Sequence, residues 1–132
     1  MIILDTHALV WLDQGSDQLG RRARLSIEAA FRQEEIAVAT ISFWEVGMWL
    51  TQNRLVFSGE LQAWRVSLLG SGFTEIAADG NVALTAAQLK DFEGDMADRL
   101  IAATALSEKA RLVTADRRLL DRRGLRTINA RI

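Results

Sequence analysis

The sequence opens on Ile2-Ile3-Leu4, a short apolar run that leads directly to Asp5. A run of this kind is typical of a buried strand, although three residues are too few to identify one from periodicity alone. The same pattern returns late in the chain, where Leu112-Val113-Thr114-Ala115 leads to Asp116. We therefore expect both acids to lie at the carboxyl ends of strands.

The segments between these two runs alternate between strand-like and helix-like patterns. Further strands are expected at 36–40, 73–77 and 127–128, and helices over 21–33 and from Ser42, Ser58 or Glu60, Asp79 and Asp95. Strands separated by helices indicate βαβ crossovers, so the sequence predicts an α/β fold with a mainly parallel sheet covered on both faces. In such sheets the ligand crevice lies outside the carboxyl ends of the strands.

The composition is that of a globular protein. The chain has 132 residues, of which 49% are hydrophobic, and we expect a single domain over residues 1–132. No window approaches the roughly 18 unbroken apolar residues of a membrane helix, and the start is not a secretory signal. Cysteine is absent, which excludes disulfides, thiolate metal sites and a cysteine nucleophile. We therefore expect a cytoplasmic protein with no membrane partner.

The charge is unevenly distributed. The net charge of −1 argues against generic coating of DNA, but residues 99–132 hold 9 basic and 3 acidic side chains. Such a segment can meet phosphates. A solvated face paired with acidic neighbours explains most of these residues equally well. The arginines of the last stretch are Arg117, Arg118, Arg122, Arg123, Arg126 and Arg131.

Parallel connectivity could bring four acids to one rim of the sheet. Asp5 and Asp116 follow strands, whereas Glu45 and Asp98 are expected in the first turns of the helices that open near Ser42 and Asp95. Carboxylates that are packed together at a partly buried site repel one another, at a cost on the order of a few kcal/mol per pair. Mg²⁺ or Mn²⁺ would relieve that repulsion and activate a water for attack on a phosphodiester.

Each acid also has a purely structural explanation. Glu45 stands three residues after Ser42, which is the spacing of a capping box. Asp95 and Asp116 could each cap a helix, and Asp98 could favour the positive end of a helix dipole. Asp5, finally, could begin a turn. The hypothesis of a site therefore rests on the four acids together.

The segments that carry these acids resemble the motifs of a known family. The sequence is similar to PIN-domain ribonucleases, and among them to the VapC-type toxins of bacterial toxin–antitoxin pairs. One departure is Met96, where related sequences often carry proline, and it leaves every acid in place. The resemblance covers essentially the whole chain and rests on four stretches in the same order, namely Ile3-Leu4-Asp5-Thr6-His7-Ala8-Leu9-Val10-Trp11, Ser42-Phe43-Trp44-Glu45-Val46, Asp95-Met96-Ala97-Asp98-Arg99-Leu100-Ile101-Ala102-Ala103-Thr104-Ala105 and Leu112-Val113-Thr114-Ala115-Asp116.

The resemblance implies a three-layer α/β/α sandwich and cleavage of RNA that depends on Mg²⁺ or Mn²⁺. By motif position, Asp5, Glu45 and Asp98 correspond to three core metal-binding acids, and Asp116 corresponds to the fourth. The resemblance also implies a homodimer and an antitoxin that inserts a segment near the active site. The residues that would assist the acids are Asp95, Thr6 and Thr114.

Two other functions stay open. One is a metal-dependent nuclease that acts on DNA or in RNA processing, because the metal chemistry reads phosphate rather than base. The other is a catalytically silent PIN-like binding module, which predicts a missing acid, and none is missing. A phosphatase with a phospho-aspartate at Asp5 fits poorly, because His7 stands where its second aspartate would be.

The remaining notable side chains have mainly structural interpretations. His7, the only histidine, is expected to pack or hydrogen-bond near the site rather than bind a metal. Arg99 is expected to form an ion pair with a neighbouring carboxylate. The tryptophans are expected in the core, although one of them could contact an antitoxin or a second subunit, since aromatic side chains are enriched at interfaces. They are Trp11, Trp44, Trp49 and Trp64.

Overall fold

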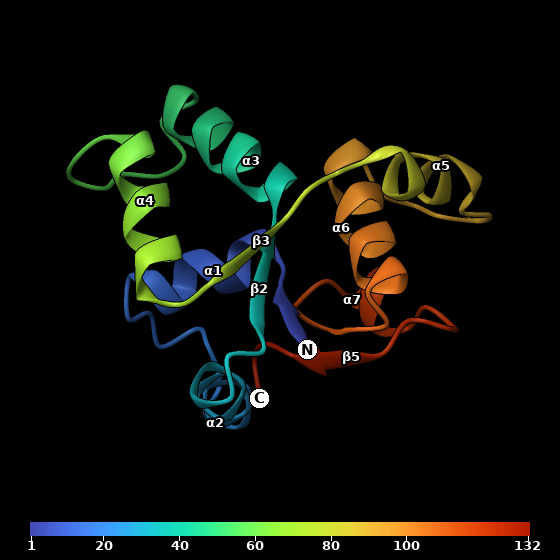
Figure 1. Cartoon of the computed structure of the whole chain (residues 1–132), viewed down its shortest axis with the longest axis horizontal. Coiled ribbons are helices and arrows are strands. Elements are labelled where there is room, and N and C mark those ends of the chain that lie inside the picture. Colours follow the sequence, from blue (N-terminus) through green and yellow to red (C-terminus); the bar gives the residue numbers. More distant parts are fainter.

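All strands of the central sheet run parallel to their neighbours (Figure 1). The computed structural model describes residues 1–132. The sheet has the order β3-β2-β1-β4-β5, so β1 lies at its centre, and Leu4 at the end of β1 pairs with Val38 and with Val113. The predicted parallel sheet is confirmed. The strands are β1 (Ile2–Leu4), β2 (Ile36–Ala39), β3 (Thr74–Ile76), β4 (Arg111–Thr114) and β5 (Thr127–Asn129).

Helices cover both faces of this sheet. Figure 1 shows α1, α2 and α4 on one side and α5, α6 and α7 on the other, while α3 leaves the carboxyl end of β2. The predicted three-layer α/β/α architecture is therefore confirmed. None of the helices is both long and apolar enough to cross a membrane. The helices are α1 (Thr6–Asp13), α2 (Arg21–Arg32), α3 (Thr40–Thr51), α4 (Leu61–Ser71), α5 (Gly80–Gln88), α6 (Met96–Ser107) and α7 (Arg117–Leu120).

The central strand, β1, contributes side chains to both hydrophobic cores. Alternate residues of a strand point to opposite faces of the sheet. Ile2 and Leu4 accordingly pack in the core formed with α1, α2 and α4, whereas Ile3 packs in the core beneath α6. None of the three is more than 2% exposed. A strand buried on both faces needs apolar residues at successive positions, which explains why the opening run contains no polar residue.

The start of α3 differs from the prediction. The helix begins at Thr40, directly after β2, so Glu45 lies in its second turn and not in its first. Ser42 is therefore inside the helix, fully buried, and makes no capping box with Glu45. The expected cap fails because Ala39 ends the strand and serves as the N-cap without an intervening loop.

Candidate active site

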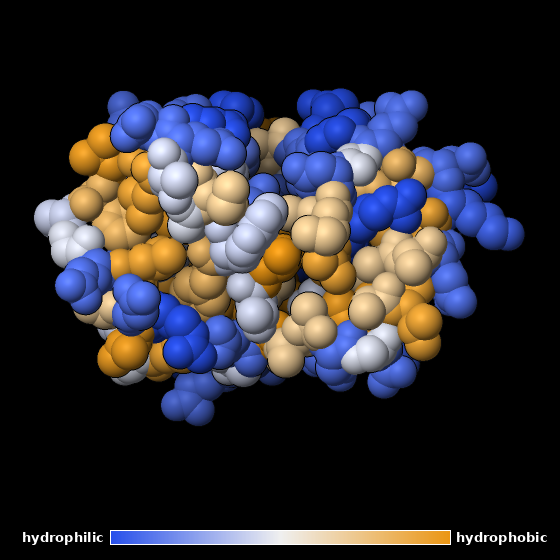
Figure 2. Space-filling view, turned by 90° about the horizontal axis from the view of Figure 1, so that it is seen from above, coloured by the Kyte–Doolittle hydropathy of each residue, from blue (hydrophilic) through white to orange (hydrophobic).

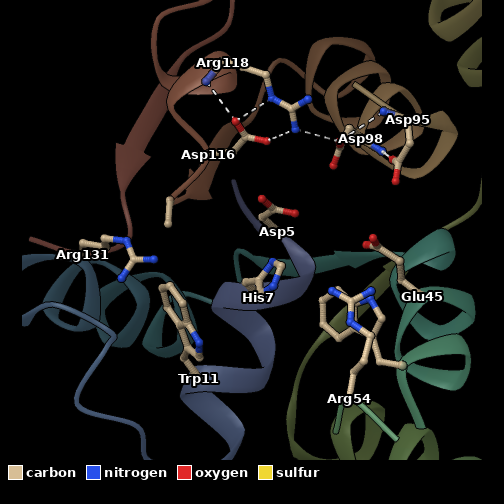
Figure 3. A pocket seen from close by; sticks show the side chains of 12 residues that line it. Asp5, His7, Trp11, Glu45, Arg54, Asp95, Asp98, Asp116, Arg118 and Arg131 are labelled. Carbon is tan, nitrogen blue, oxygen red and sulfur yellow. Dashed lines mark hydrogen bonds and ion pairs between the residues drawn. The ribbon is translucent and has the colours of Figure 1, made fainter. Parts of the chain in front are cut away.

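A cavity of about 370 Å³ opens at the carboxyl edge of the sheet. All four predicted acids border it, together with the predicted auxiliary residue Asp95 (Figure 3). Asp5 follows β1, Asp116 follows β4, Glu45 comes from α3, and Asp98 comes from the first turn of α6. The structure thus brings together acids that are more than a hundred residues apart in the sequence.

Asp5 is the most deeply buried of these acids, with only 6% of its surface exposed. One carboxylate oxygen accepts a hydrogen bond of 2.8 Å from the backbone N–H of Thr6. The other accepts one of 2.6 Å from the hydroxyl of Thr114. Burial raises the pKa of Asp5, and the two hydrogen bonds oppose that rise. Both oxygens are held, so the orientation of this carboxylate is fixed by β4 and α1.

Glu45 is tied to the same centre by Thr6. The Thr6 hydroxyl donates a hydrogen bond of 2.6 Å to Oε1 of Glu45 and lies 2.9 Å from the buried Ser42 hydroxyl. Burial raises the pKa of Glu45 to about 7, and the negative charges of Asp5 and Asp98 add to the rise. Both threonines predicted as auxiliary residues therefore contact acids of the cavity. The hydroxyl of Thr6 contacts Glu45 and that of Thr114 contacts Asp5.

Asp95 and Asp98 form the capping box of α6. The Asp95 carboxylate accepts from the backbone N–H of Asp98 at 2.9 Å, and the Asp98 carboxylate accepts from the N–H of Asp95 at 3.3 Å. Burial raises the pKa of Asp98 to about 6, and the charge of Asp95 contributes. The structural explanation for Asp95 is correct, and the same cap fixes Asp98 at the border of the cavity.

Asp116 caps α7 and also pairs with Arg118, which the sequence placed only in a general cluster of arginines. The Arg118 guanidinium lies 2.6 Å from Oδ2 of Asp116 and 3.2 Å from Oδ2 of Asp98, so it bridges the two acids. Its hydrogen bonds hold the pKa of Asp116 below its usual range. The available signal was its place two residues after Asp116, at the start of the helix that Asp116 caps.

The electrostatics of the cavity favour a hard cation. The pKa values of Asp5, Glu45 and Asp98 are all raised, which means that their negative charges are costly as they stand. No three acidic side chains converge closely enough to hold one ion directly. Mg²⁺ usually takes one or two carboxylates and keeps several waters, so a partly hydrated ion fits this all-oxygen donor set.

The other predictions for this region have mixed outcomes. His7 is exposed, and its ring packs 4.6 Å from the ring of Trp49, in agreement with a packing residue near the site. The prediction of an ion pair for Arg99 is wrong. Its guanidinium lies between α5 and α6 and does not face the acids. It donates hydrogen bonds there to the backbone carbonyls of Ala86 and Leu89.

The tryptophans also differ among themselves. Trp11 and Trp49 are each 8% exposed and border the cavity. Trp64 is partly buried against the core and its indole N–H has no hydrogen-bond partner. Trp44, on the outer side of α3, is 51% exposed. The expectation of core positions therefore holds for three of the four.

Comparisons with known proteins agree with this architecture. A family model described as the PIN domain matches residues 2–125. Ribonuclease VapC22 of Mycobacterium tuberculosis is 36% identical over 128 residues, which cover 96% of this chain and 95% of that protein.

Two solved structures illustrate the shared fold. VapBC2 from Rickettsia felis, bound to a DNA fragment from its promoter, superposes with a TM-score of 0.71 at 20% identity, over 98% of both chains. A toxin–antitoxin complex from Klebsiella pneumoniae superposes with a TM-score of 0.68 at 22% identity, again over 98% of both chains.

Proposed function

The chain belongs to the PIN-domain family, and we propose on that basis that it is a metal-dependent endoribonuclease, the toxin of a toxin–antitoxin pair. The observation that carries the proposal is the meeting of Asp5, Glu45, Asp98 and Asp116 around one cavity. The relative named as a ribonuclease, with 36% identity over nearly its whole length, supports RNA as the substrate.

The acids would hold Mg²⁺ or Mn²⁺. Asp5 and Asp98 are the best placed for direct contact, since their helix caps and hydrogen bonds already fix them at the border of the cavity. Glu45 and Asp116 would complete the site through water molecules bound to the ion. When bound, such an ion would lower the pKa of a water molecule and stabilise charge on the phosphate under attack. No nucleophilic side chain of the protein is required.

The chain's own residues prepare this site. Thr114 and the N–H of Thr6 fix both oxygens of Asp5, and the Thr6 hydroxyl fixes one oxygen of Glu45. Arg118 neutralises Asp116 and part of the charge of Asp98. A guanidinium pairs as readily with phosphate as with carboxylate. Arg118 would therefore contact the substrate once a cation has taken over these two acids.

The proposed partner is an antitoxin, in keeping with the toxin–antitoxin complexes that share this fold. Hydrophobic side chains are exposed between hydrophilic ones on the side of the molecule that carries α3 and α4, left in Figure 2. Trp44, Val56 and Val66 are between 51% and 85% exposed and offer contacts for an antitoxin or a second subunit. The homodimer and the cytoplasmic location are part of the same proposal.

Cleavage of matched RNA and DNA tests the proposed function. Purified protein, free of any antitoxin, would be incubated with single strands of the same sequence in Mg²⁺, in Mn²⁺ and in EDTA. We expect RNA to be cut with either metal and to stay intact in EDTA, while DNA is not cut. Cleavage of DNA at the same rate would point to a less selective nuclease, and intact RNA under every condition would contradict the proposal.

A further inference from the structure

Part of the cavity border consists of aromatic and basic side chains. Opposite Asp116 and Arg118, the α1 residues His7 and Trp11 face the cavity together with Trp49 from α3. Two arginines flank these rings, Arg131 beside Trp11 and Arg54 beside Trp49, and Figure 3 shows them on either side of His7. The rings and the two arginines together are called the basic aromatic wall below.

The members of this wall form one continuous row. The Arg131 guanidinium carbon lies 4.9 Å from the centroid of the Trp11 ring, and the Arg54 carbon lies 5.7 Å from that of Trp49. His7 lies between the two tryptophans, with ring centroids 6.0 Å from Trp11 and 4.6 Å from Trp49. Both tryptophans are almost completely buried, so they are rigid supports for the two exposed guanidinium groups.

The charges of the two arginines are not neutralised within the chain. Neither guanidinium has a carboxylate within ion-pair distance. Their side-chain hydrogen bonds are long, 3.4 Å from Arg54 to Gln52 and 3.5 Å from Arg131 to Gln18. Arg118, on the opposite wall, is instead paired with Asp98 and Asp116. Arg54 and Arg131 are thus the free cations of the cavity border.

An RNA substrate needs such cations. Five acidic residues border the cavity and repel a polyanion. A metal ion neutralises them only at the centre, so the phosphates before and after the cleaved bond need other partners. Guanidinium groups bind phosphate oxygens with well-matched geometry. Proteins that hold unpaired RNA commonly combine such backbone contacts with aromatic rings beside the bases.

We propose that the basic aromatic wall is the binding site for single-stranded RNA, with Arg54 and Arg131 holding the phosphates on the two sides of the cleaved bond. The exposed ring of His7, which lies between them, faces an unpaired base. This inference rests on the proposed ribonuclease function and adds to it the residues that bind the substrate on either side of the cleaved bond. A stacked base must be unpaired, so loops and single strands are bound in preference to duplex.

The dependence of RNA binding on salt tests this site. The Asp98→Asn variant would serve as the parent protein so that RNA stays intact in Mg²⁺, and a short fluorescent single strand would be titrated at several salt concentrations. Each phosphate contact to a single strand contributes about 0.7 to the slope of log affinity against log salt. Arg54→Gln and Arg131→Gln are each expected to weaken binding and to reduce the slope by about that amount.

Two kinds of control separate this role from a structural one. Arg32→Gln removes the same charge from an exposed arginine that does not border this cavity, and it should leave the slope unchanged. Arg54→Lys and Arg131→Lys keep the charge, and they should restore the slope even where affinity stays lower. Duplex RNA should bind more weakly than the single strand to the parent protein.

The outcomes also separate this inference from the proposed function. If the unsubstituted protein cuts RNA but the two glutamine variants bind it with the slope of Arg32→Gln, the basic aromatic wall does not bind the substrate. The two arginines would then be assigned to contacts with a protein partner instead of RNA. If the unsubstituted protein does not cut RNA at all, the proposed function itself is wrong.

Discussion

Arg118 bridges Asp98 and Asp116, with one guanidinium nitrogen 3.2 Å from the first carboxylate and 2.6 Å from the second. The bridge joins the start of α6 to the short helix α7, two elements that the sequence separates by β4. It places a permanent positive charge where a divalent cation is proposed to act. The guanidinium and the cation therefore compete for the same oxygens.

Removal of this competitor should tighten metal binding. Without the guanidinium, Asp98 and Asp116 repel each other and the remaining acids without compensation, so Arg118→Gln is expected to bind Mn²⁺ more tightly than the unsubstituted protein. Calorimetric titration without RNA measures the affinity. Arg117→Gln is the matched control, because Arg117 pairs only with Asp121 on the surface. Weaker Mn²⁺ binding by Arg118→Gln than by Arg117→Gln would show that the bridge assembles the site and does not compete for it.

The stability of the metal-free protein should fall as pH rises from about 4.5 to about 7. The pKa of Glu45 is raised from 4.5 to about 7 and that of Asp98 from 3.8 to about 6, so the folded state binds more protons than the unfolded state in this range. Stability declines with pH wherever the folded state holds the extra protons. Thermal melting across this range measures the effect, and Glu45→Gln should flatten its upper part. A melting temperature that rises with pH over the same range would contradict the assignment.

Metal binding should release protons below about pH 7. A carboxylate must be deprotonated to bind a cation, and the raised pKa values of Glu45 and Asp98 leave both partly protonated in that range. The apparent affinity for Mn²⁺ is therefore expected to rise with pH up to about 7 and to level off above it. Calorimetry in two buffers with different heats of ionisation counts the protons released. No difference between the buffers at pH 6 would count against an involvement of these two acids.

The hydroxyl of Thr114 should favour the charged form of Asp5, because its hydrogen bond opposes the rise in the pKa of that carboxyl. Thr114→Val retains the shape of the side chain but removes the hydroxyl that donates to Asp5. The unpaired oxygen is expected to cost about 1–3 kcal/mol of stability and to raise the pKa of Asp5 further. Metal affinity at neutral pH should fall as a result. Thr104→Val, which removes another buried hydroxyl, one bonded to the backbone of α6, is the control and should leave metal affinity unchanged.

Much of the fold and the acidic centre followed from sequence pattern. The apolar runs before Asp5 and Asp116 predicted buried parallel strands, because a strand covered on both faces needs apolar residues at consecutive positions. Parallel pairing then predicted that both acids meet at one edge. That expectation agrees with the structure, where Leu4 and Val113 are paired just before them.

The features that the sequence did not predict depend on boundaries and on side-chain direction. Ser42 has the composition of an N-cap, but β2 continues into α3 without a loop, and the hydroxyl is buried against Thr6. Arg118 and Arg99 are chemically alike, and only the three-dimensional packing assigns one to the acids and the other to backbone carbonyls. Sequence spacing does not determine such choices.

The basic aromatic wall could not be predicted from the sequence for a related reason. Arg131 contacts Trp11 from the far end of the chain, and nothing local in either segment indicates that contact. The cluster of arginines near the end suggested phosphate binding as one of two interpretations. The structure divides that cluster, because Arg118 pairs with acids whereas Arg131 is free of them.

The entry to α6 offers a test of how precisely Asp98 must be placed. A side chain at Gly94 would clash with the ring of Phe92 and approach Cβ of Asp98 to 2.9 Å. Gly94→Ala is therefore expected to shift Asp98 and to reduce RNA cleavage, while the protein remains folded at the assay temperature. Gly70→Ala, where a Cβ meets no atom within 4 Å, is the control. Unchanged cleavage by Gly94→Ala would mean that the loop adjusts without moving the acid.

The most direct test of the acidic centre is RNA cleavage by carboxylate-to-amide variants. Asp5→Asn and Asp98→Asn preserve the shape of each side chain but remove its charge, and Asp121→Asn makes the same change at an exposed position away from the cavity. With Mn²⁺ present, we predict that both cavity variants lose most of the cleavage while remaining folded by circular dichroism, and that Asp121→Asn cuts as the unsubstituted protein does. Equal cleavage by all of these proteins would show that the acids serve only as caps and turns, and it would contradict a catalytic role for this site.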